Sequence, residues 1–391
     1  MSAGHEVCLW HEDDRGAHRD RPQISSLSAI LSWNPPERAV PEAIASLVQW
    51  RPDIVFVHSR LDPKVEQQLL DVCPAVFFAH DYVGMCISGA KTLHDPDPHP
   101  CGRTLGSLCL AHYYPHRCGG LDPRTMFRDY FGNKEQLKRL RRYRVVASDS
   151  SYLRDEYIRH GLDAERLKVV PLLVSSGALR ISTRRDSHGN SPVALGFAGR
   201  LEAQKGVDVL LDSLEHVASS LGRRVTLTIA GDGRLRESLR RKAAAIMVPK
   251  KIDVRFVGWL DDAALESFYQ SLDAIVIPSV WPEPFGTVGI EAAARGIPAA
   301  AFDVGGLSDW LTDGKNGHFA DGTSPNSIGL ASAIVSCVAD ADHHYRLSEG
   351  ALAVAASFSE ENHLRALMDV LDCVGAGSSL RQTDSLVASG S

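Results

Sequence analysis

The stretch that decides the fold runs from Val193 to Gly206 and reads VALGFAGRLEAQKG. It begins with a continuous apolar run of strand length, continues through a glycine and Arg200, and ends with Lys205 before a helical pattern. A strand, a glycine turn and a helix start in this order are typical of the carboxyl edge of a parallel sheet, where such folds bind anions. The segment is neither a P-loop nor a dinucleotide fingerprint. Arg200 and Lys205 are therefore either anion ligands or two solvated surface cations.

The same alternation of apolar runs and helical patterns continues to residue 302. Short continuous apolar runs indicate strands that are buried on both faces, as in a parallel sheet. Five βα units predict a Rossmann-like domain over 192–356. We expect strands at 195–198, 225–230, 255–257, 274–278 and 299–302, with helices at about 205–219, 233–246, 262–271 and 287–295.

Shorter apolar runs in residues 1–175 predict a second Rossmann-like, doubly wound sheet. The boundary between the two domains falls in the Ser-, Gly- and Arg-rich stretch 174–192. A last amphipathic helix is predicted over 359–374, and the Gly/Ser-rich segment 375–391 is expected to be disordered. The fold class is thus α/β, with two parallel-sheet domains.

Composition excludes several classes of protein. The chain has 391 residues with 42 Lys and Arg against 48 Asp and Glu, a net charge of −6, which argues against a nucleic-acid binder. No apolar run is long enough to span a membrane and no leader pattern opens the chain, so we expect a cytoplasmic protein. The basic stretch 124–144 is either a solvated helix face or a patch for peripheral contact with the inner face of a membrane.

A second segment with chemical potential runs from Glu283 to Glu291 and reads EPFGTVGIE. It follows a predicted strand, and its two carboxylates could accept hydrogen bonds from vicinal sugar hydroxyls. The backbone N–H groups of Gly286, Thr287 and Val288, next to Phe285, are unpaired donors at a helix start and suit phosphate oxygens. Alternatively, either glutamate is a surface residue or a partner of the helix dipole.

Five segments in order carry a family resemblance: FAGRLEAQKGVDVLLDSL, LTIAGDGRLRESL, the long run from VRFVGWL to AAAFDVGG, LTDGKNGHF and SFSEENHLRALMDVL. Over about 195–373 the chain resembles the retaining GT-B glycosyltransferases of family 4, the glycosyl transferases group 1. The resemblance implies two domains facing a cleft, with the last helix crossing back onto the first domain. It also implies transfer of a sugar, with retention, from a nucleoside diphosphate sugar to a glycan, lipid-linked or small-molecule acceptor, with no cofactor and no metal requirement.

The resemblance assigns roles to individual residues. Arg200 and Lys205 would hold the diphosphate, Glu283 the donor sugar and Glu291 the ribose. Backbone near Gly231 and Gly258 would contact the base. His80, in the His-Asp pair after the strand at 75–79, would lie at the reaction centre, although a histidine capping a strand end remains an alternative.

Cysteines and histidines crowd into the segment that follows His80. They could hold a structural zinc ion, but the spacing lacks paired C-x2-C motifs, and free thiols are the alternative that we favour. The residues are Cys86, Cys101, Cys109, Cys118, His112 and His116.

Two departures from the family pattern qualify the functional expectation. Family members begin with a strand, a glycine-rich loop and a helix before a segment like Gly4–Leu9, whereas this chain opens at that segment. We therefore expect the central strand of the first sheet to be missing, through either a start assigned downstream or a chain of reduced activity. Ser308-Asp309 also replaces the usual Pro-Glu. A catalytically impaired nucleotide-sugar-binding paralogue or partner subunit is the alternative function, and a nicotinamide dehydrogenase is a more distant one.

Overall fold

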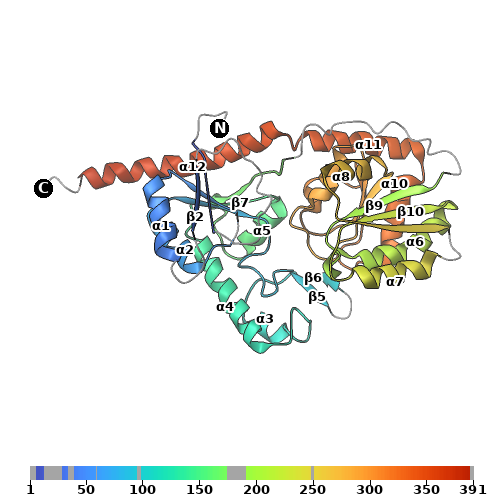
Figure 1. The fold of residues 1–391 in the computed structure, drawn as a ribbon, viewed down its shortest axis with the longest axis horizontal. Helices are drawn as coiled ribbons and strands as arrows, with labels where there is room; N and C mark the ends of the chain where they lie inside the picture. Colours follow the sequence, from blue (N-terminus) through green and yellow to red (C-terminus); the bar gives the residue numbers. More distant parts are fainter. Residues whose placement is uncertain are drawn as a thin grey trace.

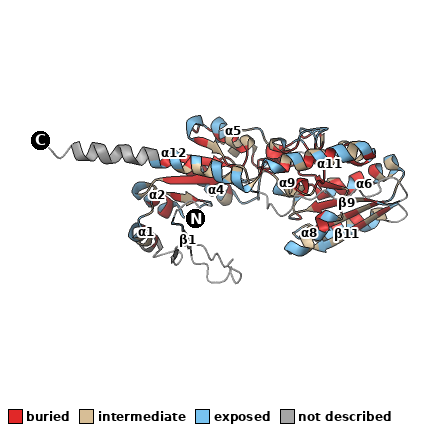
Figure 2. Ribbon diagram, turned by 90° about the horizontal axis from the view of Figure 1, so that it is seen from above, coloured by how far each residue is buried: buried red, intermediate tan, exposed pale blue. Residues whose placement is uncertain are grey.

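The structure is a computed structural model that describes residues 6–12, 29–33, 39–58, 60–94, 98–173, 191–247 and 251–387. Two α/β bodies lie side by side, and the helix α12 (Glu360–Val387) runs back along the first of them (Figure 1). In each body the strands are largely buried while the helices keep exposed faces (Figure 2).

The second body is built on one six-stranded parallel sheet with the order β11-β10-β9-β12-β13-β14. The predicted alternation of strands and helices is present, and the structure adds β14, a strand of four residues that the sequence pattern did not predict. The strands are β9 (Val193–Ala198), β10 (Val225–Ala230), β11 (Ile252–Gly258), β12 (Ala274–Ile277), β13 (Ala299–Phe302) and β14 (Gly317–Ala320). The helices are α6 (Val207–Leu221), α7 (Arg236–Met247), α8 (Asp262–Gln270), α9 (Thr287–Ala293), α10 (Ser327–Val338) and α11 (Ala341–Ala356).

The first body has a four-stranded parallel sheet with the order β3-β4-β7-β8 and a separate parallel pair, β1-β2. Among the described residues, β3 is hydrogen-bonded to β4 alone and β1 to β2 alone. The strands are β1 (Cys8–Glu12), β2 (Ala29–Trp33), β3 (Val55–Val57), β4 (Ala75–Ala79), β7 (Val145–Ser148) and β8 (Leu167–Val169), with an antiparallel hairpin of β5 (Thr92–His94) and β6 (Pro98–Pro100). The helices are α1 (Ala39–Trp50), α2 (Pro63–Val72), α3 (Ser107–His112), α4 (Pro123–Leu140) and α5 (Ser151–Arg159).

Helix α12 joins the end of the chain to the first body. Its Val370 and Val374 are buried in a cluster with Val76, Phe78 and Val145 of the four-stranded sheet. The predicted end of this helix at residue 374 is wrong, because α12 continues to Val387; the predicted disorder of 375–391 stays a prediction. No proline follows residue 374, and Leu380, Arg381 and Gln382 are good helix formers, so local preference opposes the stop suggested by the glycines.

Candidate functional site between the two bodies

Glycine geometry brings the end of β9 close to the end of β12. Gly206 has a left-handed backbone with φ +63°, and a Cβ there would lie 1.9 Å from the carbonyl oxygen of Pro278. Only glycine permits this approach without a shift of the backbone. The short 3-10 helix η3 (Ala203–Lys205) therefore lies against the segment that follows β12. Lys205 is in this way placed beside Glu283, which is 78 residues away in sequence.

Lys205 and Glu283 form a polar cluster with two further side chains. Lys205 Nζ lies 2.5 Å from Glu283 Oε1, and the Ser279 hydroxyl donates to the same oxygen at 2.5 Å. Lys205 Nζ also lies 5.3 Å from the centre of the Trp281 ring, a cation–π distance. The Lys205 side chain is 19% exposed and Glu283 is 5% exposed, so the charge of the lysine can be reached from the cleft.

A cavity of about 320 Å³ opens at this cluster and takes its walls from both bodies. Its volume is in the range of small-molecule sites. We call it the cleft cavity. It brings together most of the residues predicted for donor binding and catalysis: His80, Arg200, Lys205, Glu283, Phe285, Gly286, Thr287 and Val288. Arg200 is exposed and has no ion-pair partner among the described residues.

Three predicted residues are not among those that line the cleft cavity. Gly231 and Gly258 lie next to each other, with the Gly231 amide donating to the Gly258 carbonyl at 2.7 Å. Glu291, on α9, accepts a hydrogen bond from the Tyr269 hydroxyl at 2.7 Å. Burial and the neighbouring Glu291 raise the pKa of Tyr269, so this hydroxyl keeps its hydrogen. Glu291 is thus held by a side chain of α8, and its predicted contact with the ribose stays a prediction.

The first body holds the segment from Trp281 to Pro284 directly. The Tyr82 hydroxyl donates to the carbonyl of Pro282 at 2.5 Å, and the Ser150 hydroxyl donates to that of Pro284 at 2.5 Å. Asp309 accepts from both the backbone N–H and the hydroxyl of Ser151, at 2.6 and 2.7 Å. The residue that we had noted only as a departure from the family pattern therefore ties the two bodies together beside the site.

A second cavity, of about 360 Å³, lies wholly in the first body and shares His80 with the cleft cavity. We call it the N-terminal cavity. Besides His80 it is lined by His58 and Arg60, which follow β3, and by Asp129 and Asn133 of α4. Sequence reasoning missed His58 here and Asp149 in the cleft cavity. The signal that could have found them is a polar residue at the end of a short apolar run, which the structure shows to be β3 before His58 and β7 before Asp149.

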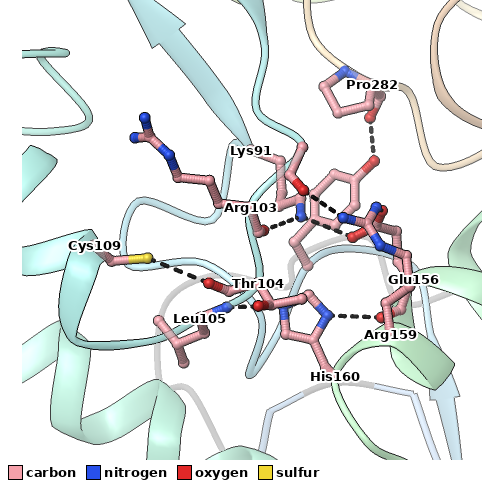
Figure 3. Close-up of polar contacts among 11 residues, drawn as sticks. Lys91, Arg103, Thr104, Leu105, Cys109, Glu156, Arg159, His160 and Pro282 are labelled. Carbon is pink, nitrogen blue, oxygen red and sulfur yellow. Dashed lines mark hydrogen bonds and ion pairs between the residues drawn. The ribbon is translucent and has the colours of Figure 1, made fainter.

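The loop between β6 and α3 is held by a buried ion pair that involves Lys91, the residue before β5 (Figure 3). Lys91 Nζ lies 2.7 Å from Glu156 Oε2 and donates to the Arg103 carbonyl at 2.7 Å. The side chains of Lys91 and Glu156 are 1% and 2% exposed. The backbone N–H of Leu105 donates to His160 Nε2 at 3.1 Å. Burial lowers the pKa of His160, which is therefore neutral and able to accept this bond.

The cysteines of this loop are free thiols. Burial, followed by the nearby thiols of Cys86, Cys101 and Cys109, raises the pKa of Cys118 to about 11. Within the described residues, no group of three or more His, Cys, Asp or Glu side chains has an arrangement that could hold a metal ion.

The basic stretch 124–144 lies mainly on α4, and several of its cations are paired. Arg139 contacts Glu66 at 2.6 Å, and Arg142 contacts Asp71 at 2.5 Å. These pairs reduce the positive field of the stretch. In the part of the chain that the structure describes, no helix is long and apolar enough to cross a membrane.

Comparison with known proteins finds a match to a family model in the second body. Residues 182–353 match the family model described as glycosyl transferases group 1. The match spans less than half of the chain. A D-inositol 3-phosphate glycosyltransferase of Xylanimonas cellulosilytica is 31% identical over 240 residues, which are 58% of this chain and 56% of that protein. A glycogen synthase of Mycobacterium tuberculosis is 35% identical over 184 residues, which are 47% of this chain and 39% of that protein.

Solved structures extend the likeness to both bodies. Anabaena Alr3699/HepE, crystallised with UDP and glucose, superposes with a TM-score of 0.61 at 20% identity and covers 88% of this chain and 86% of its own. The lipopolysaccharide outer core galactosyltransferase WaaB superposes with a TM-score of 0.58 at 15% identity, over 88% of this chain and 84% of its own. The chain has the GT-B fold.

Proposed function

We propose that this protein is a group 1 glycosyltransferase that transfers a hexosyl group, with retention, from a nucleoside diphosphate sugar that binds in the cleft cavity. The observation that carries the proposal is the convergence of Arg200, Lys205 and Glu283 with His80 at one cavity between two Rossmann-like bodies. Two cations suit a diphosphate, and a carboxylate suits sugar hydroxyls. The match of residues 182–353 to the glycosyl transferases group 1 model supports the same chemistry.

The positions of the charges fit the demands of glycosyl transfer. As the bond between the sugar and the diphosphate breaks, negative charge grows on the leaving diphosphate. Fixed cations that face this charge stabilise the transition state more than the ground state. Lys205, held between Glu283 and the Trp281 ring, is preorganised for this role. Arg200 is exposed on the wall of the same cavity and supplies the second cation.

The first donor to test is a UDP-sugar, because the structurally similar Anabaena Alr3699/HepE was crystallised with UDP, with UDP and glucose, and with UDP-glucose. The N-terminal cavity is the proposed acceptor site, since His80 lines both cavities and so lies between donor and acceptor. Its charged and polar walls suit a hydroxyl-rich glycan, lipid-linked or small-molecule acceptor. Such a reaction belongs to polysaccharide or glycoconjugate synthesis.

A second candidate is a nucleotide-sugar-binding subunit with impaired transfer. One observation favours it: among the described residues, β1-β2 and β3-β4-β7-β8 are separate sheets, so the first body lacks the continuous sheet of the second. Such a subunit would bind the donor and leave it intact.

The experiment that tests the proposal combines binding and turnover. The full chain is titrated calorimetrically with UDP-glucose, UDP-N-acetylglucosamine and GDP-mannose, and release of nucleoside diphosphate is then followed with a panel of sugar and lipid-linked acceptors. Transfer that gives a product with the same anomeric configuration as the donor supports the retaining enzyme. Donor binding with neither transfer nor hydrolysis supports the second candidate. Absence of binding to every nucleotide sugar contradicts both.

A further inference from the structure

Three polar side chains begin where three neighbouring strands end. His58 directly follows β3, His80 follows β4 and Asp149 follows β7. These strands are adjacent in the order β3-β4-β7 and run parallel. Because the carboxyl ends of parallel strands meet at one edge of a sheet, the three side chains form a row along that edge.

The members of this row contact one another. His80 Nδ1 lies 3.7 Å from Asp149 Oδ2, and His80 Nε2 lies 3.4 Å from His58 Nδ1. The two imidazole rings are nearly parallel, at 11°, with their centres 5.7 Å apart. Hydrogen bonds in catalytic sites are commonly long before substrate binds and shorten afterwards. The distance between His58 and His80 is within hydrogen-bond range, and the ionic contact between His80 and Asp149 would have to shorten in this way to become a hydrogen bond.

The hydrogens of the row can be assigned from the carboxylate outward. The ionised carboxylate of Asp149 can only accept, so Nδ1 of His80 carries the hydrogen. With its single hydrogen on Nδ1, His80 has a bare Nε2, which accepts the hydrogen of His58 Nδ1. Nε2 of His58 is left as an acceptor. The carboxylate therefore sets the tautomers of two histidines in turn.

The burial of Asp149 at this position lowers the folding stability of the protein. Its side chain is 5% exposed, and its Oδ1 is buried without a hydrogen-bond partner among the described residues. Burial raises the pKa of Asp149, and the contact with His80 opposes that rise. A buried carboxylate with an unpaired oxygen costs stability. Its presence on the wall of the cleft cavity points to a role in the reaction.

The row joins the two cavities. Asp149 and His80 line the cleft cavity, and His80 and His58 line the N-terminal cavity. His58, whose Nε2 is left to accept a hydrogen bond, thus lies in the cavity proposed for the acceptor substrate. The other charged or titratable side chains that line this cavity are Arg60, Asp81, Tyr82, Cys86 and Asp129.

We propose that His58 is the general base for the acceptor hydroxyl, and that Asp149 is a positioning residue that acts through His80; this rests on the proposed function. In the transfer step the acceptor oxygen bonds to the anomeric carbon on the face from which the diphosphate leaves, as retention requires. The bond from that carbon to the diphosphate oxygen breaks, and its electron pair leaves with the diphosphate. The proton of the acceptor hydroxyl passes to Nε2 of His58. Burial and the neighbouring His80 lower the pKa of His58, which keeps it neutral and ready to take this proton.

The tautomers are tested without any substrate. Long-range ¹H–¹⁵N spectra of the full chain with ¹⁵N-labelled histidine report which ring nitrogen carries the hydrogen, and His58→Gln and His80→Gln assign the signals. We expect hydrogen on Nδ1 of both residues in the wild type. In Asp149→Asn, the side-chain amide can donate to His80 Nδ1, so the hydrogen of His80 should move to Nε2 and the signals of His58 should shift. Hydrogen on Nε2 of His58 in the wild type would overturn the proposal, even if Asp149→Asn failed to fold.

A matched control exists in the second body. Asp313 Oδ1 lies 3.1 Å from His318 Nδ1, a second Asp-His pair that lies outside both cavities. Asp313→Asn should alter the signals of His318 and leave those of His58 and His80, and the transfer rate, unchanged. Equal signals of His58 and His80 in the wild type and Asp149→Asn would contradict the relay.

Kinetics test the role of the base. With UDP-glucose as donor probe and an acceptor found in the panel, His58→Gln should lower kcat about a hundredfold or more, the usual size of a general-base contribution. The affinity for UDP-glucose should stay within about twofold, because His58 does not line the cleft cavity. Wild-type kcat in this variant would overturn the proposal. Correct tautomers in a chain that transfers no sugar would instead show that the proposed function, and the base role with it, is wrong.

Discussion

Two lysine–carboxylate pairs in this molecule have similar distances and very different surroundings. Lys91 and Glu156 are 2.7 Å apart with side chains only 1% and 2% exposed, whereas Lys205 and Glu283 are 2.5 Å apart at the wall of the cleft cavity. The first pair has hydrogen-bond partners on all sides and fastens a loop (Figure 3). The second pair faces a volume large enough for a ligand. The comparison teaches that burial separates a structural ion pair from one that is available for chemistry.

The largest expected effect is on stability, from breaking the buried pair. Lys91→Met leaves the charge of Glu156 buried with Arg159 as its remaining ionic partner. Removing one partner of a buried pair costs about 3–5 kcal/mol, and we expect a loss near the lower end of that range because Arg159 remains. Denaturant unfolding measures it. Adding Glu156→Gln should recover part of the loss, and no change in the unfolding midpoint of Lys91→Met would contradict the structural role.

The next effect is on turnover, from breaking the pair in the cleft. Lys205→Ala should reduce transfer by about a hundred- to a thousandfold, because the loss of one preorganised donor to a transition-state charge costs about 2.7–4 kcal/mol. The unfolding midpoint should stay close to that of the wild type, since Glu283 keeps the hydrogen bond from Ser279. Lys242→Ala, which removes a surface lysine paired with Asp212, is the control and should leave turnover unchanged. Wild-type turnover in Lys205→Ala would mean that the lysine does not act on the diphosphate.

The smallest effect is a pH dependence of folding stability, which we expect from His160 near the Lys91–Glu156 pair. Burial lowers the pKa of His160 below its unfolded value of 6.5. The unfolded chain therefore binds more protons than the folded one as the pH falls below 6.5, so folding stability should decrease in that direction. His160→Gln should flatten the dependence, as measured by chemical unfolding between pH 7.5 and 5. An unchanged slope in His160→Gln would assign the effect to other groups.

The second body could be predicted well from the sequence because short, local patterns specify its strands and its predicted anion-binding loop. Continuous apolar runs mark strands that are buried on both faces, and the glycine-bounded segment at 199–206 places Arg200 and Lys205 by itself. The roles of the site depend on longer-range geometry. His58, His80 and Asp149 are brought together only by the strand order β3-β4-β7, and a single residue after a strand has no pattern of its own. The pairing of Lys91 with Glu156 also could not be predicted, because the two residues are 65 apart in the sequence.

The central claim is that Arg200 and Lys205 bind a diphosphate in the cleft cavity. Calorimetric titration of the full chain with UDP, GDP and ADP, each compared with its nucleoside, measures this most directly. The account predicts that one diphosphate binds much more tightly than its nucleoside to the wild type, and that this difference nearly disappears in the Arg200→Ala, Lys205→Ala double variant while nucleoside affinity is kept. Equal advantage of the diphosphate in the wild type and the double variant would contradict it.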